Sequence, residues 1–214
     1  MGNCCYPEEY SELFDGREAG RVARRFRNRG LSLAADNVVE SVIGRGIDGA
    51  SILEVGGGVG QIHIALLEAG AAKATNVDLS GNWESEATAL LREHGLERQV
   101  QRHVADFVDA ADGIDPADVV VAHRVLCCYP DLTMMLGAVA DHSRRVVVLT
   151  VPKDTWWIRA FLALSNGWLA VRRRQFRAFA HPIPDMVTFL ADAGFRLVDD
   201  RSRPVWRTLV FERA

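Results

Sequence analysis

A glycine-rich turn and two acidic residues are the features of this sequence most able to do chemistry. The stretch ILEVGGGVGQ brings Glu54 to a run of glycines, and NVDLS places Asp78 about 20 residues further on. Glycine is needed where a ligand presses on the backbone or where φ must be positive. A carboxylate at a strand end can accept hydrogen bonds from both hydroxyls of a ribose. The pattern predicts a nucleoside-binding site.

The spacing of the glycines separates two classes of nucleoside cofactor. The dinucleotide fingerprint G-x-G-x-x-G, counted from Gly56, needs glycine at its sixth position, and Gln61 stands there. The sequence instead reads acid-x-Gly-x-Gly-x-Gly from Glu54 to Gly60. A nicotinamide-dependent oxidoreductase therefore remains an alternative hypothesis, and the presence of Gln61 in place of the sixth-position glycine argues against it.

Two further segments end apolar runs in the same way. VADF contains Asp106 and Phe107, and HRVLCCYPD begins with His123 directly after an apolar run. Together with the glycine turn and NVDLS, this order resembles class I S-adenosylmethionine-dependent methyltransferases. The resemblance covers residues 50–151 and extends more loosely into the C-terminal segments.

That resemblance implies a cofactor, S-adenosyl-L-methionine, and the residues that bind it. Asp78 is expected to bind the ribose hydroxyls, and Asp106 with Phe107 to lie beside the adenine. HRVLCCYPD also resembles, over a short stretch, the matching segment of magnesium-protoporphyrin O-methyltransferases, which hints at a hydrophobic small-molecule substrate. The expected cofactor-binding residues are Glu54, Gly56, Gly57, Gly58, Gly60, Asp78, Leu79, Asp106, Phe107 and His123.

A sulfonium methyl group is already activated, so its in-line transfer needs alignment more than acid–base help. Alignment alone supplies roughly 7–11 kcal/mol of barrier reduction in favourable cases. A carboxylate acceptor needs no base, whereas a phenol or an amine is helped by one. The candidate catalytic residues are His123, Tyr129 and His181, and each also has a purely structural interpretation, at a strand end, in packing or before a helix.

Strands and helices must alternate for these segments to meet. Apolar runs that predict strands lie at 50–55, 73–78, 100–107, 117–124 and 144–152, with helical patterns between them. Residues 196–202 and 205–213 predict a closing hairpin at an antiparallel edge. The fold class is therefore α/β, flanked by helices on both faces. The methyltransferase resemblance implies a Rossmann-like, seven-stranded, mostly parallel sheet with an antiparallel C-terminal strand.

A single domain, residues 1–214, is expected, because this length suffices for one full core. The N-terminal helical part contains one helix over 8–28 and a second that buries Leu33, Val38, Val39 and Val42. The expected parts are a helical cap at 1–48, a cofactor-binding core at 49–152, a lid-like insertion at 153–183, and a C-terminal helix and hairpin at 184–214.

The insertion interrupts the alternation with TWWIRAFLALSNGWLAV, which is apolar nearly all round, followed by RRRQFR. Three tryptophans favour a lid over an apolar substrate. The trailing arginines also suit a peripheral contact of 155–177 with an anionic membrane surface. A core helix followed by a solvated basic turn explains the segment equally well.

Paired cysteines occur twice, each time followed by Tyr-Pro: Cys4 and Cys5, then Cys127 and Cys128. Adjacent cysteines lack the C-x₂₋₄-C spacing that zinc sites prefer, so no metal is expected. Disulfides are not expected either, and small buried thiols filling tight turns remain the default interpretation. The location is then a reducing, cytoplasmic one, in keeping with the absence of a signal-like or membrane-spanning apolar run.

The net charge of −3 gives no reason to expect nucleic-acid binding, although the arginine run at 21–29 favours it locally. A small-molecule substrate is therefore expected. A non-catalytic S-adenosylmethionine-binding protein is the remaining alternative, and the intact acids Glu54, Asp78 and Asp106 count against a decayed pocket.

Overall fold

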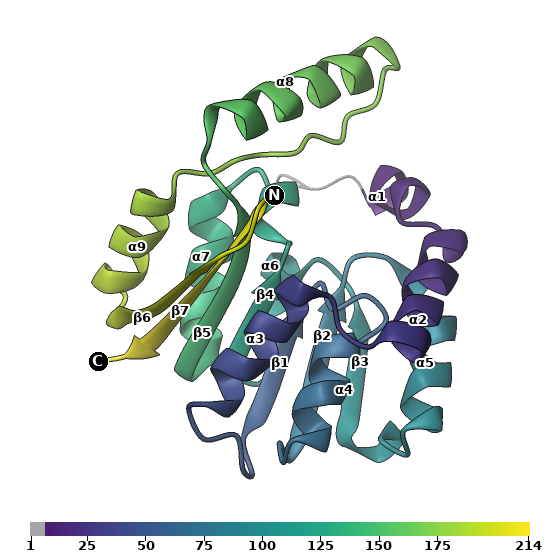
Figure 1. The fold of residues 1–214 in the computed structure, drawn as a ribbon, viewed down its shortest axis with the longest axis vertical. Helices are drawn as coiled ribbons and strands as arrows, with labels where there is room; N and C mark the ends of the chain where they lie inside the picture. The colour runs from purple at the N-terminus through teal and green to yellow at the C-terminus, as the bar shows by residue number, and fades with distance from the viewer. Residues whose placement is uncertain (1–6) are drawn as a thin grey trace.

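One twisted sheet organises the protein, whose computed structural model describes residues 7–214 (Figure 1). The strand order is β3-β2-β1-β4-β5-β7-β6; β1 to β5 run parallel, and β7 is antiparallel between β5 and β6. This confirms the predicted mostly parallel sheet and its antiparallel C-terminal strand. The strands are β1 Ser51–Val55, β2 Lys73–Asp78, β3 Val100–Val104, β4 Ala117–His123, β5 Ser143–Pro152, β6 Phe195–Ser202 and β7 Trp206–Arg213.

The two faces of the sheet carry separate hydrophobic cores, because successive side chains of a strand point to opposite faces. On β1, Ile52 belongs to the core beneath α2, α3, α4 and α5, and Leu53 to the core beneath α6, α7 and α9. The predicted helices on both faces are thus present. Their bounds are α2 Gly16–Arg29, α3 Leu33–Ile43, α4 Gln61–Glu68, α5 Glu84–Glu93, α6 Phe107–Ala110, α7 Leu132–His142 and α9 Ile183–Asp192.

The N-terminal segment forms two helices, α1 Pro7–Leu13 and α2, so the prediction of one helix over 8–28 was wrong. Asp15 interrupts the helix, because its carboxylate accepts hydrogen bonds from the backbone N–H groups of Arg17 and Glu18, at 3.0 and 2.9 Å, and so caps α2. Leu33 also departs from expectation. It is 68% exposed, since Ala34 and Ala35 take the positions against the core.

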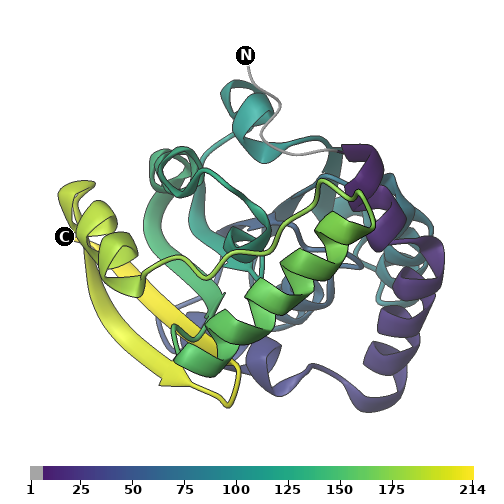
Figure 2. The ribbon, with the colours of Figure 1, turned by 90° about the horizontal axis from the view of Figure 1, so that it is seen from above.

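Helix α8 Trp156–Val171 crosses above the carboxyl ends of the strands, from the end of β5 toward α1 (Figures 1 and 2). Only Ile158 of this helix is buried. Beyond its C-terminus, Arg174 forms an ion pair with Glu12 of α1. None of the helices within residues 7–214 combines the length and apolarity that crossing a membrane requires.

Candidate functional site

The site lies where the chain order of the sheet reverses. From β1 the chain moves outward to β2 and β3, and from β4 it moves the other way to β5. The loops that leave β1 and β4 therefore diverge and open a crevice at the carboxyl edge, the usual ligand position in such sheets. The glycine turn follows β1, and His123 ends β4.

The glycine turn has no room for side chains. Gly56, Gly58 and Gly60 have φ of 65°, 56° and 90°, in the left-handed region that favours glycine. A Cβ added to Gly56 would lie 2.5 Å from Cγ2 of Val125. One added to Gly57 would collide with the Asn76 amide. The backbone of the turn is therefore the surface that the crevice offers to a ligand.

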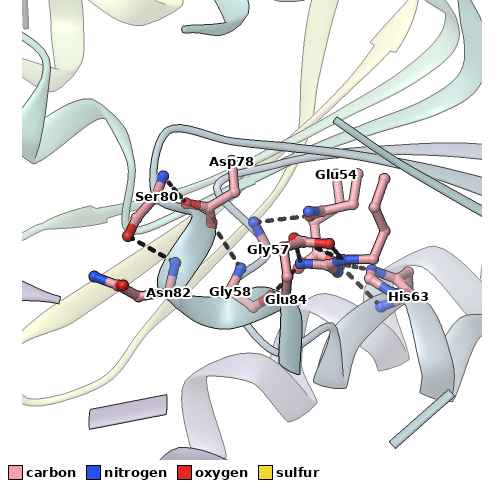
Figure 3. Close-up of polar contacts among 10 residues, drawn as sticks. Glu54, Gly57, Gly58, His63, Asp78, Ser80, Asn82 and Glu84 are labelled. Atoms are coloured by element: carbon pink, nitrogen blue, oxygen red, sulfur yellow. Dashed lines mark hydrogen bonds and ion pairs between the residues drawn. The ribbon is translucent and has the colours of Figure 1, made fainter. Parts of the chain in front are cut away.

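Residues from the neighbouring strands hold the turn in place (Figure 3). The Gly57 N–H donates to Oδ1 of Asn76 at 3.1 Å, and the Gly58 N–H donates to Oδ2 of Asp78 at 2.9 Å. Nη2 of Arg102, on β3, donates to the Gly58 carbonyl at 2.8 Å. The turn is thus fixed before any ligand arrives.

Asp78 is 2% exposed and has capacity for further hydrogen bonds. Its Oδ1 accepts from the Ser80 N–H at 3.0 Å, and its Oδ2 from Gly58. A carboxylate offers about four acceptor positions, so these bonds leave two for a vicinal diol. Burial raises the pKa of Asp78 above its usual range, and the two backbone hydrogen bonds oppose that shift.

Glu54 is also buried, but a neighbouring histidine engages it. Oε2 of Glu54 lies 2.6 Å from Nδ1 of His63, and the His63 N–H donates to the same oxygen at 3.2 Å (Figure 3). Glu54 therefore links β1 to the first turn of α4. This contact orients the helix that begins at the glycine turn.

Two adjacent hollows occupy the crevice and share Tyr10, Gly56 and Val125. The larger, about 190 Å³, is lined by polar groups that include Glu54, Gly57, Gly58, Asp78, His123 and Arg124. The smaller, about 40 Å³, is mainly apolar and is lined by Leu79, Ala105, Asp106, Phe107, Cys128 and Met135. Most of the predicted cofactor residues thus converge on one place, although Gly60 lines neither hollow.

The sequence predicted that Asp106 and Phe107 end a strand, and this prediction was wrong. The two residues stand at the start of a helix. Strand β3 stops at Val104, and Asp106 caps α6 through the Val108 N–H, which donates to its Oδ1 at 2.9 Å. A side chain that can accept backbone N–H groups favours this change of direction. Phe107 is buried and lies edge-on to His142, with ring centroids 5.3 Å apart.

His123 is the one of the three catalytic candidates that lines the larger hollow. Its Nδ1 lies 3.0 Å from Oγ1 of Thr150, whereas its Nε2 has no hydrogen-bond partner among residues 7–214. Burial, with a smaller effect of the Arg124 guanidinium, lowers the pKa of His123 to about 3. The ring is therefore neutral at physiological pH.

Tyr129 and His181 contact each other and line neither hollow. Nε2 of His181 lies 2.9 Å from the backbone oxygen of Tyr129, and the imidazole stacks on Phe179 at 5.5 Å. Tyr129 is buried in the core beneath α7 and α9. Their catalytic roles stay predictions, and the contacts described here tie the return chain after α8 to the end of β4.

The sulfur atoms of Cys127 and Cys128 lie 3.7 Å apart. Cys4 and Cys5 lie outside the described residues. Within residues 7–214 no group of three His, Cys, Asp or Glu side chains could hold a metal ion. Cys127 fills the short turn η4 Leu126–Cys128, where its thiol donates to the Arg124 carbonyl at 3.4 Å.

Several residues of the site were missed from the sequence. Asn76 lies two positions before Asp78 on a buried strand, so a buried polar residue was the available signal. No local signal marked the others, because their partners are distant in the chain. These residues are Tyr10, His63, Trp83, Arg102, Arg124 and Val125.

Residues 23–199 match the methyltransferase-domain family. The match spans well over half of the chain, so the protein belongs to this family. As the sequence predicted, it is an S-adenosylmethionine-dependent methyltransferase, and S-adenosylmethionine is its cofactor. No protein of curated function matches the sequence.

Solved structures share the fold at low identity. Magnesium protoporphyrin IX methyltransferase from Synechocystis PCC 6803 with bound SAH has a TM-score of 0.75 and 20% identity, covering 96% of this chain and 98% of its own. The same protein with bound SAM gives 0.73, 20% identity and full coverage of both chains. An O-methyltransferase family protein from Burkholderia thailandensis gives 0.67 and 20% identity over 93% of this chain and 61% of its own.

The residues present fit this cofactor. The glycine turn lines the larger hollow with backbone alone, because a Cβ at Gly56 or Gly57 would collide with Val125 or Asn76. Asp78 keeps two acceptor positions for a diol. The apolar hollow beside Phe107 suits a planar base. When bound, S-adenosylmethionine supplies a methyl group already activated by its sulfonium sulfur.

Proposed function

We propose that this methyltransferase acts on a small, largely apolar molecule. The observation that carries this proposal is α8, which spans the carboxyl edge of the sheet (Figure 2). Several large apolar side chains of this helix are exposed. The helix contains no acidic residue, and its single charge, on Arg159, is paired with Asp154. An apolar acceptor would bury this surface and gain about 25 cal/mol per Å² of apolar area covered.

The geometry of the crevice supports a proposal for the cofactor-binding residues. We propose that Gly56, Gly57 and Gly58 approach the methionyl part, that Asp78 binds the ribose, and that Leu79, Asp106 and Phe107 surround the base. Gly60 has a supporting role, because it starts α4 in a left-handed conformation. Glu54 orients α4 through His63 and takes part in the site by that route.

His123 is proposed to orient the methyl acceptor rather than to remove a proton from it. His123 lines the larger hollow, and its Nε2 is buried without a hydrogen-bond partner among residues 7–214. With a pKa of about 3, the imidazole is a weak base at neutral pH. An acceptor that needs no strong base therefore suits this site, and alignment in line with the donor is the main task of the protein.

Mass spectrometry of a labelled extract tests the proposal. The enzyme is incubated with S-adenosylmethionine that carries a deuterated methyl group and with an extract of cells lacking the protein. An apolar compound below about 1 kDa that gains the labelled methyl group supports it. A labelled protein or nucleic acid, or a strongly polar product, would overturn it. The Asp78→Asn variant, defective in cofactor binding, controls for labelling by other enzymes.

We also propose a peripheral membrane contact through 155–177, in a cytoplasmic enzyme. Trp156, Leu164 and Val171 are 81%, 77% and 84% exposed. Residues 155–182 contain no acidic side chain, whereas Arg172 and Arg173 follow the helix directly. Apolar side chains beside cations bind anionic lipid surfaces. The contact would deliver apolar acceptors from the lipid phase.

Vesicle flotation tests this contact. Wild-type protein should float with vesicles of phosphatidylglycerol and phosphatidylcholine, less so in high salt or with phosphatidylcholine alone. The triple variant Trp156→Ser, Leu164→Ser, Val171→Ser should stay at the bottom. A double variant of exposed apolar residues elsewhere, Leu33→Ser and Met134→Ser, should float like wild type. Equal flotation of the triple variant excludes the contact.

A further inference from the structure

Arg124 has an unusual backbone conformation at the mouth of the site. Its φ of 63° lies in the left-handed region, which non-glycine residues seldom adopt. The Arg124 N–H donates to the Thr150 carbonyl at 3.0 Å and fixes this conformation immediately after β4. Such strain persists where the surrounding structure enforces it, and it clusters at ligand sites. The residue lines the same hollow as His123.

The guanidinium of Arg124 lies over the Trp206 ring, with Cζ 4.5 Å from the ring centroid. Trp206 begins β7, which pairs with β5, whereas the glycine turn and Asp78 follow β1 and β2. The side chain is therefore directed away from the cofactor side of β4. A guanidinium stacked on an indole keeps its edge N–H groups in its own plane, where they are free to donate.

No carboxylate within residues 7–214 forms an ion pair with Arg124. Burial lowers the pKa of Arg124, the neighbouring Cys127 raises it, and the Arg25 guanidinium of α2 has a smaller lowering effect. A second cation near the first is unfavourable unless an anion lies between or beside them. The Arg124 side chain is exposed at the mouth of the site, so its guanidinium is accessible to an anionic ligand.

Arg25 belongs to a basic face of α2 that borders an open hollow of about 480 Å³. Arg24, Arg25 and Arg29 form no ion pair with the described residues, whereas Arg27 of the same helix is paired with Glu86 and Glu93 of α5. The whole chain has a net charge of −3, so this positive region is local. It would attract an anion toward the crevice.

We propose that the methyl acceptor is a carboxylic acid whose carboxylate binds the Trp206-stacked guanidinium of Arg124. The in-plane pair of N–H groups matches the two oxygens of a carboxylate. This inference rests on the proposed function and narrows it, because the acceptor then joins an apolar body to one anionic group. Arg124 is a specificity-determining residue in this arrangement.

Two probes of the same shape and different charge test the inference by calorimetry. 2-Naphthoate should bind the SAH-loaded wild-type protein about tenfold or more tightly than the neutral 2-naphthamide. In Arg124→Leu the advantage of the acid should disappear, and in Arg124→Lys it should be partly kept. Arg98→Leu removes an exposed arginine at the opposite end of the sheet and should behave like wild type. Equal or absent binding of the two probes by wild type overturns the inference, as does an unchanged preference in Arg124→Leu.

The cofactor also carries a carboxylate, which is a second candidate ligand for Arg124. A second pair of ligands distinguishes the carboxylate of the cofactor from that of the acceptor. SAH has this group, and 5′-methylthioadenosine lacks it. Arg124→Leu should bind SAH as wild type does. If the variant instead binds SAH only as weakly as 5′-methylthioadenosine, Arg124 holds the cofactor and the inference is wrong. Absence of heat with SAH in wild type would instead contradict the proposed function itself.

The natural acceptor provides an independent measurement. When the cell extract is passed over an anion exchanger at neutral pH, the compound that accepts the labelled methyl group should be retained and then released by salt. Acceptor activity that stays in the flow-through would overturn the inference while leaving methyl transfer established.

Discussion

The Asp78 carboxylate accepts a hydrogen bond from the Gly58 N–H at 2.9 Å, and so ties the end of β2 to the turn that follows β1. The same side chain has two acceptor positions left for a ligand. Asp78 therefore has two tasks, and substitutions that separate them are informative.

Asp78→Asn should weaken SAH binding by about tenfold to a hundredfold, because an amide offers a diol fewer acceptor positions and no charge. Its carbonyl can still accept from only one of the two backbone N–H groups, so the free energy of unfolding should fall by about 1–3 kcal/mol. Calorimetry and thermal denaturation measure the two effects. Asp141→Asn, an exposed substitution on α7, is the matched control. Unchanged SAH affinity in Asp78→Asn would contradict the assignment of the ribose site.

Gly57→Ala should destabilise the fold by about 1–3 kcal/mol, because the new methyl group would collide with Asn76 and lie 2.8 Å from Cδ of Glu54. SAH affinity should fall as well, since the cradle must shift. Gly113→Ala, where a Cβ meets no atom within 4 Å, should leave both quantities unchanged. Urea denaturation with SAH titration checks this, and equal stability of the two variants would argue against a tightly packed turn.

The buried contact between Glu54 and His63 should show energetic coupling. Removing either partner alone leaves the other buried with an unmet polar group, whereas removing both does not. The single variants Glu54→Gln and His63→Leu and the double variant complete a cycle, for which we expect a coupling of at least about 1 kcal/mol. Additive effects on the free energy of unfolding would show that the 2.6 Å contact is energetically neutral.

His123 should make stability depend on pH in the acidic range. Its pKa falls from 6.5 to about 3 on folding, so between these values the unfolded chain binds a proton that the folded chain does not. The contribution of a neutral His123 to the free energy of unfolding is fully present above pH 6.5. It is lost as the pH falls toward 3, with a slope of up to about 1.4 kcal/mol per pH unit. His123→Asn should show a shallower slope in denaturation series across this range. Parallel curves for the two proteins would contradict a buried, neutral imidazole.

The order of functional segments could be read from the chain because each is local. A buried strand followed by glycines or by an acid is recognisable within ten or so residues, and parallel strands bring their carboxyl ends to one edge. Glu54, Gly56, Asp78 and Phe107 accordingly lie around two adjacent hollows. The same locality explains the errors. Asp106 was assigned to a strand end, and Asp15 was not recognised as a cap, because capping depends on where backbone N–H groups are left unpaired.

The sequence by itself determined the class of this protein, through a glycine turn, the acid after it and the alternation of strands and helices. Only the tertiary structure decided that Arg124 stacks on Trp206, that Asn76 and Arg102 hold the turn, and that α8 exposes its apolar side chains. These contacts join residues far apart in the chain, so their geometry depends on how the strands and helices pack and leaves no periodic trace along the sequence.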